Sequence, residues 1–372
     1  MNTRGARLIT VFLCGDVMTG RGIDQILPNP SDPRIYEAFV SDARTYVELA
    51  EDVNGPIPRP VDFSYIWGDA LIELQRNSPD ARVVNLETSV TVSDDPLPKG
   101  INYRMHPANV GCLAALGIDV CVLANNHVLD YGYSGLFETL ETLQQAGLRT
   151  TGAGRTLAEA RQPAVVDLAA DSRVVVHGFG TETSGIPPSW AATQDLAGVN
   201  FLFDLSDETA AAVEERVREI KRSHDVTIAS IHWGGNWGYE APREHIRFAR
   251  RLIDGGVSIV HGHSSHHPLP IEVYRDRLIL YGCGDFINDY EGIRGHEQYR
   301  PDLALMYFAT LNPDGGDLVQ LRMTPMQIRK MRLNRATPRD AQWLTERLAL
   351  INMSFGSWVE GAEDGSLLLC WS

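Results

Sequence analysis

Cysteines, long hydrophobic runs and basic residues are all scarce in this sequence. The five cysteines among 372 residues are widely spaced and form no CxxC pair. This spacing excludes a zinc ribbon and a thioredoxin-like motif, and it favours buried, reduced thiols in a cytoplasmic protein. No segment approaches the ~20 consecutive apolar residues that a membrane-spanning helix needs. We therefore expect no membrane association.

Positive charge is outweighed by negative charge. The chain has 33 Lys and Arg against 48 Asp and Glu, which gives a formal net charge of −15. Nucleic-acid binding needs clustered Lys and Arg to neutralise phosphates, so we expect no nucleic-acid partner. The hydrophobic content of 44% is typical of a globular protein with a sizeable core. The apolar run at residues 8–14 lacks a small-residue cleavage site, so we interpret it as a buried strand rather than a signal peptide.

Short apolar runs alternate with amphipathic segments, which predicts an α/β fold with two mixed sheets flanked by helices. The later strands follow one another directly, which is typical of antiparallel pairing. The predicted strands are 9–14, 81–85, 120–123, 165–168, 173–178, 226–231, 257–260, 271–274, 278–281, 303–310, 318–325 and 327–333, and the predicted helices are 34–50, 69–75, 107–116, 135–146, 209–222 and 243–253.

The strand and helix pattern predicts one main domain over residues 1–335. Within it, residues 24–65 contain six prolines and predict an insertion with one amphipathic helix. Residues 336–372 are interpreted as a helix and a strand that extend the same domain. The sequence does not predict an oligomeric state.

Polar side chains follow five of the predicted strands. Singly, an Asp or Asn in such a place usually caps a helix, and a lone histidine is usually a core residue. Together they combine carboxylate, amide and imidazole groups, which suit a divalent ion, at strand ends that meet in one crevice. The residues are Asp16; Asn85 and Glu87; Asn125, Asn126, His127 and Asp130; His232; and four of the eleven histidines, namely His261, His263, His266 and His267.

These motifs resemble the CapA family of poly-γ-glutamate synthesis proteins, within the calcineurin-like metallophosphatase superfamily. The resemblance runs over about residues 8–290 and implies a four-layer α/β/β/α sandwich with a divalent metal. The matching segments are Gly15-Asp16-Val17-Met18, Asn85-Leu86-Glu87-Thr88, Leu123 to Gly132 (LANNHVLDYG), Gly152-Ala153-Gly154, His232-Trp233-Gly234 and Pro270-Ile271-Glu272.

The resemblance also implies which residues hold the metal. The implied ligands of one intact site are Glu87, Asn126, His232 and His263, and a second site would keep only Asp16, Glu87 and His266. Met18 stands where metallophosphatases have a histidine ligand of a second ion, and a thioether is a poor ligand for a hard divalent ion. We therefore predict one firm metal site, for Mn, Zn, Fe, Mg or Ca, with a second site weak or absent and no organic cofactor.

With one ion, several acid/base groups become free for proton transfer. We expect Asp16 with His266 to form one pair and His127 with Asp130 to form another, with Asp285 as a further catalytic carboxylate. Such pairs beside a cation suit removal and return of a proton at an amino-acid Cα. The chain also resembles the peptide epimerases of lasso-peptide biosynthesis, which implies a ribosomal precursor peptide as partner and inversion of its C-terminal residue.

Substrate contacts are predicted at two further places. The guanidinium fork of Arg104 can bind a carboxylate, and a surface salt bridge is an equal alternative. Trp233 and Trp237 lie in an aromatic, glycine-rich segment that either lines a pocket, together with His267, or packs as a core loop. Two other functions stay open, metal-dependent phosphoester hydrolysis and a part in capsule or poly-γ-glutamate synthesis, because the family motifs do not separate them.

Overall fold

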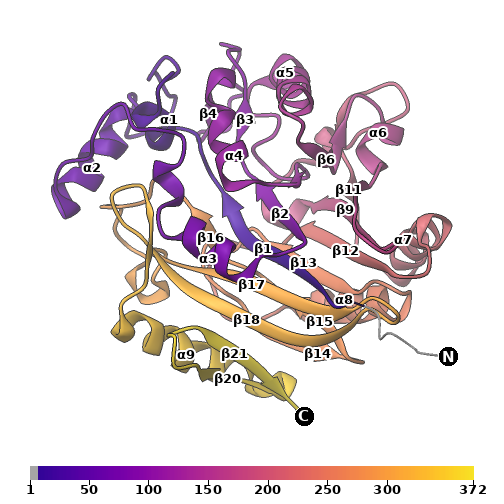
Figure 1. Ribbon diagram of the computed structural model, residues 1–372. Coiled ribbons are helices and arrows are strands. Elements are labelled where there is room, and N and C mark those ends of the chain that lie inside the picture. The colour runs from indigo at the N-terminus through magenta and orange to yellow at the C-terminus, as the bar shows by residue number, and fades with distance from the viewer. Residues whose placement is uncertain (1–6) are drawn as a thin grey trace.

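A computed structural model describes residues 7–372, and two β-sheets form its centre (Figure 1). The larger sheet has ten strands. Its central strand pairs in parallel on one side and antiparallel on the other, so the sheet is mixed. The order is β20 (Ser357–Gly361), β21 (Leu367–Trp371), β18 (Asp317–Ile328), β17 (Leu303–Asn312), β1 (Ile9–Val17), β2 (Ala81–Leu86), β5 (Val120–Val122) and β6 (Arg149–Thr151), with β16 (Asp285–Ile287) on β1 and β19 (Leu333–Arg335) on β18.

The smaller sheet has seven strands and is also mixed. Its order is β11 (Phe201–Leu202), β9 (Arg173–Thr181), β12 (Asp225–His232), β13 (Ile259–His263), β15 (Arg277–Leu280) and β14 (Ile271–Tyr274), with β8 (Ala164–Asp167) on β9. Two short ribbons join β3 (Ser89–Val90) to β4 (Arg104–Met105) and β7 (Ala153–Gly154) to β10 (Gly198–Val199).

Helices cover the outer faces of both sheets (Figure 1). The larger sheet carries α1 (Gly22–Ile26), α2 (Arg44–Asn54), α3 (Ala70–Asn77), α4 (Gly111–Leu116) and α5 (Gly132–Gln145), and α6 (Leu157–Arg161) lies beside β7. The smaller sheet carries α7 (Asp207–Ile220) and α8 (Arg243–Asp254), and α9 (Pro338–Asn352) packs beside β20.

The alternation of side chains along β1 shows how the layers are held together. Val11 and Leu13 point into the core between the two sheets, where they join Ile228 of β12. Phe12 and Cys14 point the other way, into the core under the helices of the larger sheet. A third core lies between α7, α8 and the outer face of the smaller sheet. The predicted four-layer α/β/β/α sandwich is therefore confirmed.

Three predicted elements are wrong in their bounds. The predicted helix at 34–50 begins only at Arg44, because residues 34–43 form a loop that is closed by backbone hydrogen bonds from Ile35 to Ser41 and from Ala43 to Pro33. The predicted helix at 107–116 is a 3-10 turn followed by the shorter α4. The predicted strand at 327–333 is interrupted by a turn, in which Lys330 and Met331 have φ of 59° and 51°.

The C-terminal segment has two strands where one was expected. β20 and β21 form a hairpin, and β21 pairs with β18, so this segment extends the larger sheet along its lower side in Figure 1. The domain boundary at residue 335 stays a prediction, and residues 1–6 of the predicted domain lie outside the described residues. Among residues 7–372, no helix is both long enough and apolar enough to cross a membrane.

Candidate metal and acid/base site

Strand register brings the predicted residues to one place. In the larger sheet Asp16 lies opposite Asn85 on one side and Asp285 on the other, and in the smaller sheet His232 lies opposite His263. The ligand atoms of Asp16, His232 and His263 all lie within 4.8 Å of one another, and all three residues are buried. The two sheets thus contribute to a single cluster at the carboxyl ends of their strands, as expected for an α/β fold.

A hydrogen-bond chain fixes which nitrogen of His263 faces this cluster. His261 donates through Nε2 to the carbonyl oxygen of Cys14 at 2.8 Å, so its neutral ring accepts at Nδ1. The Ser230 hydroxyl lies 3.0 Å from that nitrogen and 3.0 Å from Nε2 of His263. Ser230 therefore donates to His261 and accepts from His263. Burial lowers the pKa of both histidines, so His263 is neutral and turns the lone pair of Nδ1 toward the cluster.

Glu87 and Asn126 lie on the other side of His232. Oδ1 of Asn126 is 3.0 Å from Nε2 of His232, and Oε1 of Glu87 is 3.8 Å from the same nitrogen. The second carboxylate oxygen of Glu87 is buried and has no hydrogen-bond partner. Burial raises the pKa of Glu87, with the nearby Asp16 charge adding to the effect.

The donor set fits a divalent cation. A buried, unpartnered carboxylate oxygen costs free energy unless a cation or donor satisfies it. Burial and the Asp285 charge raise the pKa of Asp16 to about 7, so two buried carboxyl groups are held in an environment that penalises their charge. Oxygen atoms together with neutral imidazole nitrogens are the ligands that Mn²⁺ and Zn²⁺ accept.

The first acid/base pair is His127 with Asp130. Nδ1 of His127 lies 2.6 Å from Oδ2 of Asp130, and that oxygen also accepts the backbone N–H of Tyr103 at 2.6 Å. The other oxygen of Asp130 accepts from Nζ of Lys99 at 2.7 Å. Burial is the main reason that the pKa of His127 is lowered to about 4; Asp130 opposes the shift and the Lys99 charge adds to it. The ring is therefore neutral, and its Nε2 lies 3.6 Å from Oε1 of Glu87.

The second pair is His266 with Asp285, and not His266 with Asp16 as the sequence suggested. Nδ1 of His266 lies 2.9 Å from Oδ1 of Asp285, whose other oxygen accepts from the Asn288 amide at 2.7 Å. Asp16 instead accepts from the side chain of Asn85 at 2.7 Å and from the backbone N–H of Ser264 at 3.1 Å. Burial acts to lower the pKa of His266, but Asp285 and Asp16 act more strongly, so the pKa is raised.

Two tyrosines connect the pairs. The ring of Tyr103 meets His127 edge-on at 4.6 Å, and the ring of Tyr290 meets His266 edge-on at 5.4 Å. The Tyr103 hydroxyl donates to the Tyr290 hydroxyl at 3.2 Å, which donates to the sulfur of Met18 at 3.6 Å. The sulfur of Met18 is thus engaged with a tyrosine.

The predicted substrate residues divide into two groups. Arg104 is engaged by the protein itself, with Asp94 at 2.7 Å and two backbone carbonyls, which favours the salt-bridge alternative. Trp233 is 1% exposed and donates to the carbonyl of Tyr281 at 3.0 Å, so it packs in the core. Trp237 and His267 lie beside the second pair: the Trp237 ring is 5.3 Å from the His266 ring, and the His267 ring is 6.0 Å from the Trp237 ring.

Several residues that shape the site are absent from the predicted sets of metal ligands, acid/base residues and substrate contacts. Asn85 and Asn125 lie within the quoted motifs and orient Asp16 and His127 by hydrogen bonds, so the motifs contained their signal. Ser230 sits inside a buried strand and Lys99 in a loop between β3 and β4. Nothing in their sequence context points to the site.

Comparisons with known proteins were made for the whole chain. The family model described as bacterial capsule synthesis protein PGA_cap matches residues 10–290. A probable polyglutamine synthesis accessory protein of Mycobacterium tuberculosis is 47% identical over 362 residues, covering 97% of this chain and 95% of the relative. The PGA biosynthesis protein CapA of Bacillus subtilis is 25% identical over 327 residues, covering 86% of this chain and 72% of that protein.

Similarity to solved structures is lower. A 5'-nucleotidase precursor from Thermus thermophilus gives a TM-score of 0.45 at 13% identity, covering 93% of this chain and 58% of that chain, and a likeness this low carries no argument about activity. The predicted resemblance to the CapA family is confirmed, whereas the narrower resemblance to lasso-peptide epimerases stays a prediction. The match over residues 10–290 and the 47% identity show that the chain belongs to the bacterial capsule synthesis protein PGA_cap family.

Proposed function

We propose that this protein is a metal-dependent epimerase that removes and returns a proton at the Cα of a peptide residue. The observation that carries the proposal is the presence of two separate His/Asp pairs, His127–Asp130 and His266–Asp285, around one cluster of metal-binding groups. Inversion at carbon needs a base on one face and an acid on the other. Hydrolysis of a phosphoester does not require that duplication.

The surroundings of the two pairs support complementary roles. His127 has Nδ1 bonded to Asp130 and a neutral ring, so its Nε2 can accept the Cα proton. His266 has Nδ1 bonded to Asp285 and a raised pKa, so its Nε2–H can donate a proton to the opposite face. Pairs of titratable groups whose surroundings push their pKa values apart are typical acid and base partners.

One divalent cation would complete the site. Asp16, Glu87, Asn126, His232 and His263 would hold it, and when bound it would stabilise the negative charge that develops on the carbonyl oxygen next to Cα. The proposed substrate is a peptide in the cytoplasm, and we propose neither a nucleic-acid partner nor a membrane partner.

The test is hydrogen exchange at Cα. Incubation of the metal-loaded enzyme with peptides in deuterated water should add one deuterium at one Cα, read by mass spectrometry, with inversion read by chiral amino-acid analysis. The peptide panel should include α-linked peptides that differ in the C-terminal residue. If no peptide of the panel takes up deuterium, the proposal fails.

A second candidate, a part in polyglutamate synthesis, is favoured by the 47% identical relative whose name refers to polyglutamine synthesis. γ-Linked glutamyl oligomers belong in the same exchange assay for this reason. Phosphoester hydrolysis is the third alternative. Turnover of a generic phosphodiester with Mn²⁺ or Zn²⁺ that is abolished by His127→Ala would favour it over epimerisation.

A further inference from the structure

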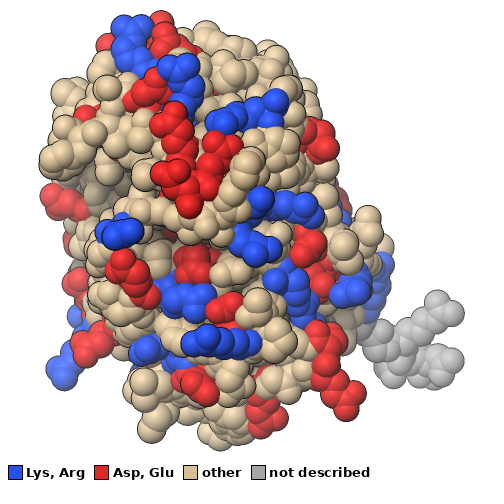
Figure 2. All heavy atoms as spheres, turned by 90° about the vertical axis from the view of Figure 1, so that its left-hand side faces the viewer, with Lys and Arg blue, Asp and Glu red and all other residues tan. Residues whose placement is uncertain are grey.

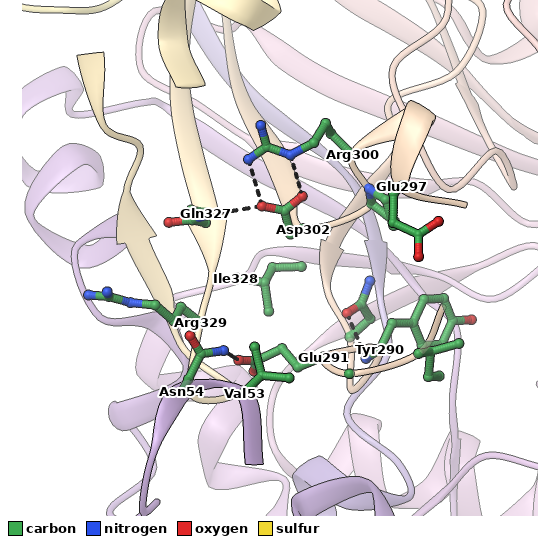
Figure 3. Close-up of a pocket in the computed structure, with 14 residues that line it drawn as sticks. Val53, Asn54, Tyr290, Glu291, Glu297, Arg300, Asp302, Gln327, Ile328 and Arg329 are labelled. Atoms are coloured by element: carbon green, nitrogen blue, oxygen red, sulfur yellow. Dashed lines mark hydrogen bonds and ion pairs between the residues drawn. The ribbon is translucent and has the colours of Figure 1, made fainter. Parts of the chain in front are cut away.

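A cavity of about 300 Å³ shares two lining residues with the surroundings of the second acid/base pair, and Figure 3 shows the residues that line it. It is enclosed by the C-terminal end of α2, the segment 288–302 and the end of β18. Asn288 and Tyr290 line it, and these same residues contact the pair: the Asn288 amide bonds Asp285, and the Tyr290 ring lies against His266. The volume is at the lower end of small-molecule sites. The wall of the cavity thus contacts the second acid/base pair.

The charges inside the cavity wall are already neutralised by partners. Arg300 holds Asp302 through two bonds of 2.8 Å and also contacts Asp340 at 2.8 Å. Glu291 accepts from the Asn54 amide at 2.6 Å and from two backbone N–H groups of the turn after β18. These groups hold the wall together, so they are not free to recognise a charged ligand.

Two further charged residues, Glu297 and Arg329, also line the cavity. Figure 3 shows the side chains of Glu297 and Arg329 turned away from Ile328, which lies at the centre of the cavity wall. The face that includes α2 carries Lys and Arg interspersed with Asp and Glu rather than a patch of one sign (Figure 2). The charged groups of the wall are therefore either paired within the protein or, as for Glu297 and Arg329, directed away from Ile328.

The surface left for a ligand is apolar. Ile328 is 2% exposed, whereas Val53 is 62% and Ile293 is 45% exposed, and all three line the cavity. We propose that this cavity binds an uncharged apolar side chain, aromatic or branched aliphatic, of the peptide substrate. The proposal rests on the proposed function in taking the occupant to be a residue of the substrate near the His266 pair. A glutamyl side chain would lose its hydration there without gaining a partner.

Binding without turnover provides the test. N-acetyl-L-tryptophanamide is the probe, and N-acetyl-L-glutamine amide is the polar comparison with the same two amide groups. Calorimetry on the full chain should show binding of the tryptophan amide and much weaker binding of the glutamine amide. Val53→Asp and Ile293→Asp should each weaken binding of the tryptophan amide by about ten-fold or more, because each places a carboxylate against the apolar ligand.

A matched control separates this effect from general damage. Val319→Asp alters a side chain that is 48% exposed on β18 but does not line the cavity, so binding should be unchanged. Thermal unfolding of all three variants checks folding, which we expect to be retained because the altered side chains are exposed. The proposal is overturned if the wild-type chain does not bind the tryptophan amide, if the glutamine amide binds equally well, or if all three variants bind alike.

The binding test of the cavity and the deuterium-exchange test of the epimerase proposal can fail independently. If the tryptophan amide binds in the expected pattern but no peptide takes up deuterium, the cavity assignment stands and the epimerase proposal fails. If peptides take up deuterium whatever their side chain, and Ile293→Asp has no effect, the epimerase stands and the cavity assignment fails.

Discussion

The two His/Asp pairs have the same composition and the same Nδ1 hydrogen bond, at 2.6 Å in His127–Asp130 and 2.9 Å in His266–Asp285. Their surroundings differ. A lysine bonds the carboxylate of the first pair, whereas a second carboxylate, Asp16, lies near the second. Burial lowers the pKa of the histidine in the first pair and Lys99 adds to this effect, whereas Asp285 and Asp16 outweigh burial and raise the pKa in the second pair. Identical residue types thus differ in pKa because of the charges next to them.

The largest effect should come from removing a ligand of the proposed metal ion, because both pairs depend on that ion. His263→Ala should reduce turnover by on the order of 10³-fold or more, because several kcal/mol of charge stabilisation in the transition state is lost. Metal counting should fall from one equivalent per chain to near zero. Proton exchange should then be lost from both stereoisomers of the substrate. Two tightly bound ions in the wild-type chain would contradict the prediction of a single firm site.

His127→Ala and His266→Ala should each abolish proton exchange from a different stereoisomer of the substrate. Each should lower kcat for inversion by roughly 10²–10⁴-fold, the range for loss of a general acid or base. Each variant should still exchange the Cα proton of one stereoisomer, the one that faces the remaining histidine. The measurement is deuterium uptake from pure L and pure D peptide. If both variants lose exchange on the same stereoisomer, the pairs do not act on opposite faces.

Smaller changes should follow from altering the neighbours of one pair at a time. Lys99→Met should lower kcat about ten-fold through its effect on the first pair. Asn288→Ala should lower kcat by about the same factor through its effect on the second pair. Losses of this size are usual for outer hydrogen-bond partners. Because the Lys99 charge lowers the pKa of His127, its removal raises that pKa. Activity of the Lys99→Met enzyme should then be lost at a higher pH on the acidic side of the profile. If the pH profile of Lys99→Met matches that of Asn288→Ala, the Lys99 charge does not influence the pKa of His127.

The smallest effect should come from the tyrosine contact between the pairs. Tyr290→Phe leaves the buried Tyr103 hydroxyl without its acceptor and should cost ~1–3 kcal/mol of unfolding free energy, whereas Tyr103→Phe should cost only ~0.5–1.5 kcal/mol. Urea denaturation measures both. Equal losses would show that the Tyr103 hydroxyl finds another acceptor when Tyr290 is changed.

The sequence predicted the strand ends better than the connections between them. Asp16, His232 and His263 follow buried strands, and the structure brings them together because parallel strands end at one edge. The partner of His266 was not predictable, since spacing along the chain does not say that β16 lies beside β1 and places Asp285 next to Asp16.

Loop residues set a further limit on the sequence-based prediction. Lys99 reaches Asp130 from an irregular segment that has no periodicity to interpret. Arg104 was ambiguous because a guanidinium suits a protein carboxylate as well as a substrate carboxylate, and the structure gives it Asp94.

The hydrogen bond between His261 and Cys14 joins residues that are 247 positions apart in the chain. The Tyr103–Tyr290 contact spans 187 positions. Long-range contacts of this kind form late, because the entropy of closing large loops must be overcome first. During synthesis the ribosome therefore releases Asp16 long before its partners exist. Metal affinity should accordingly appear only in the folded, complete chain. Binding of the ion would then indicate that folding is complete.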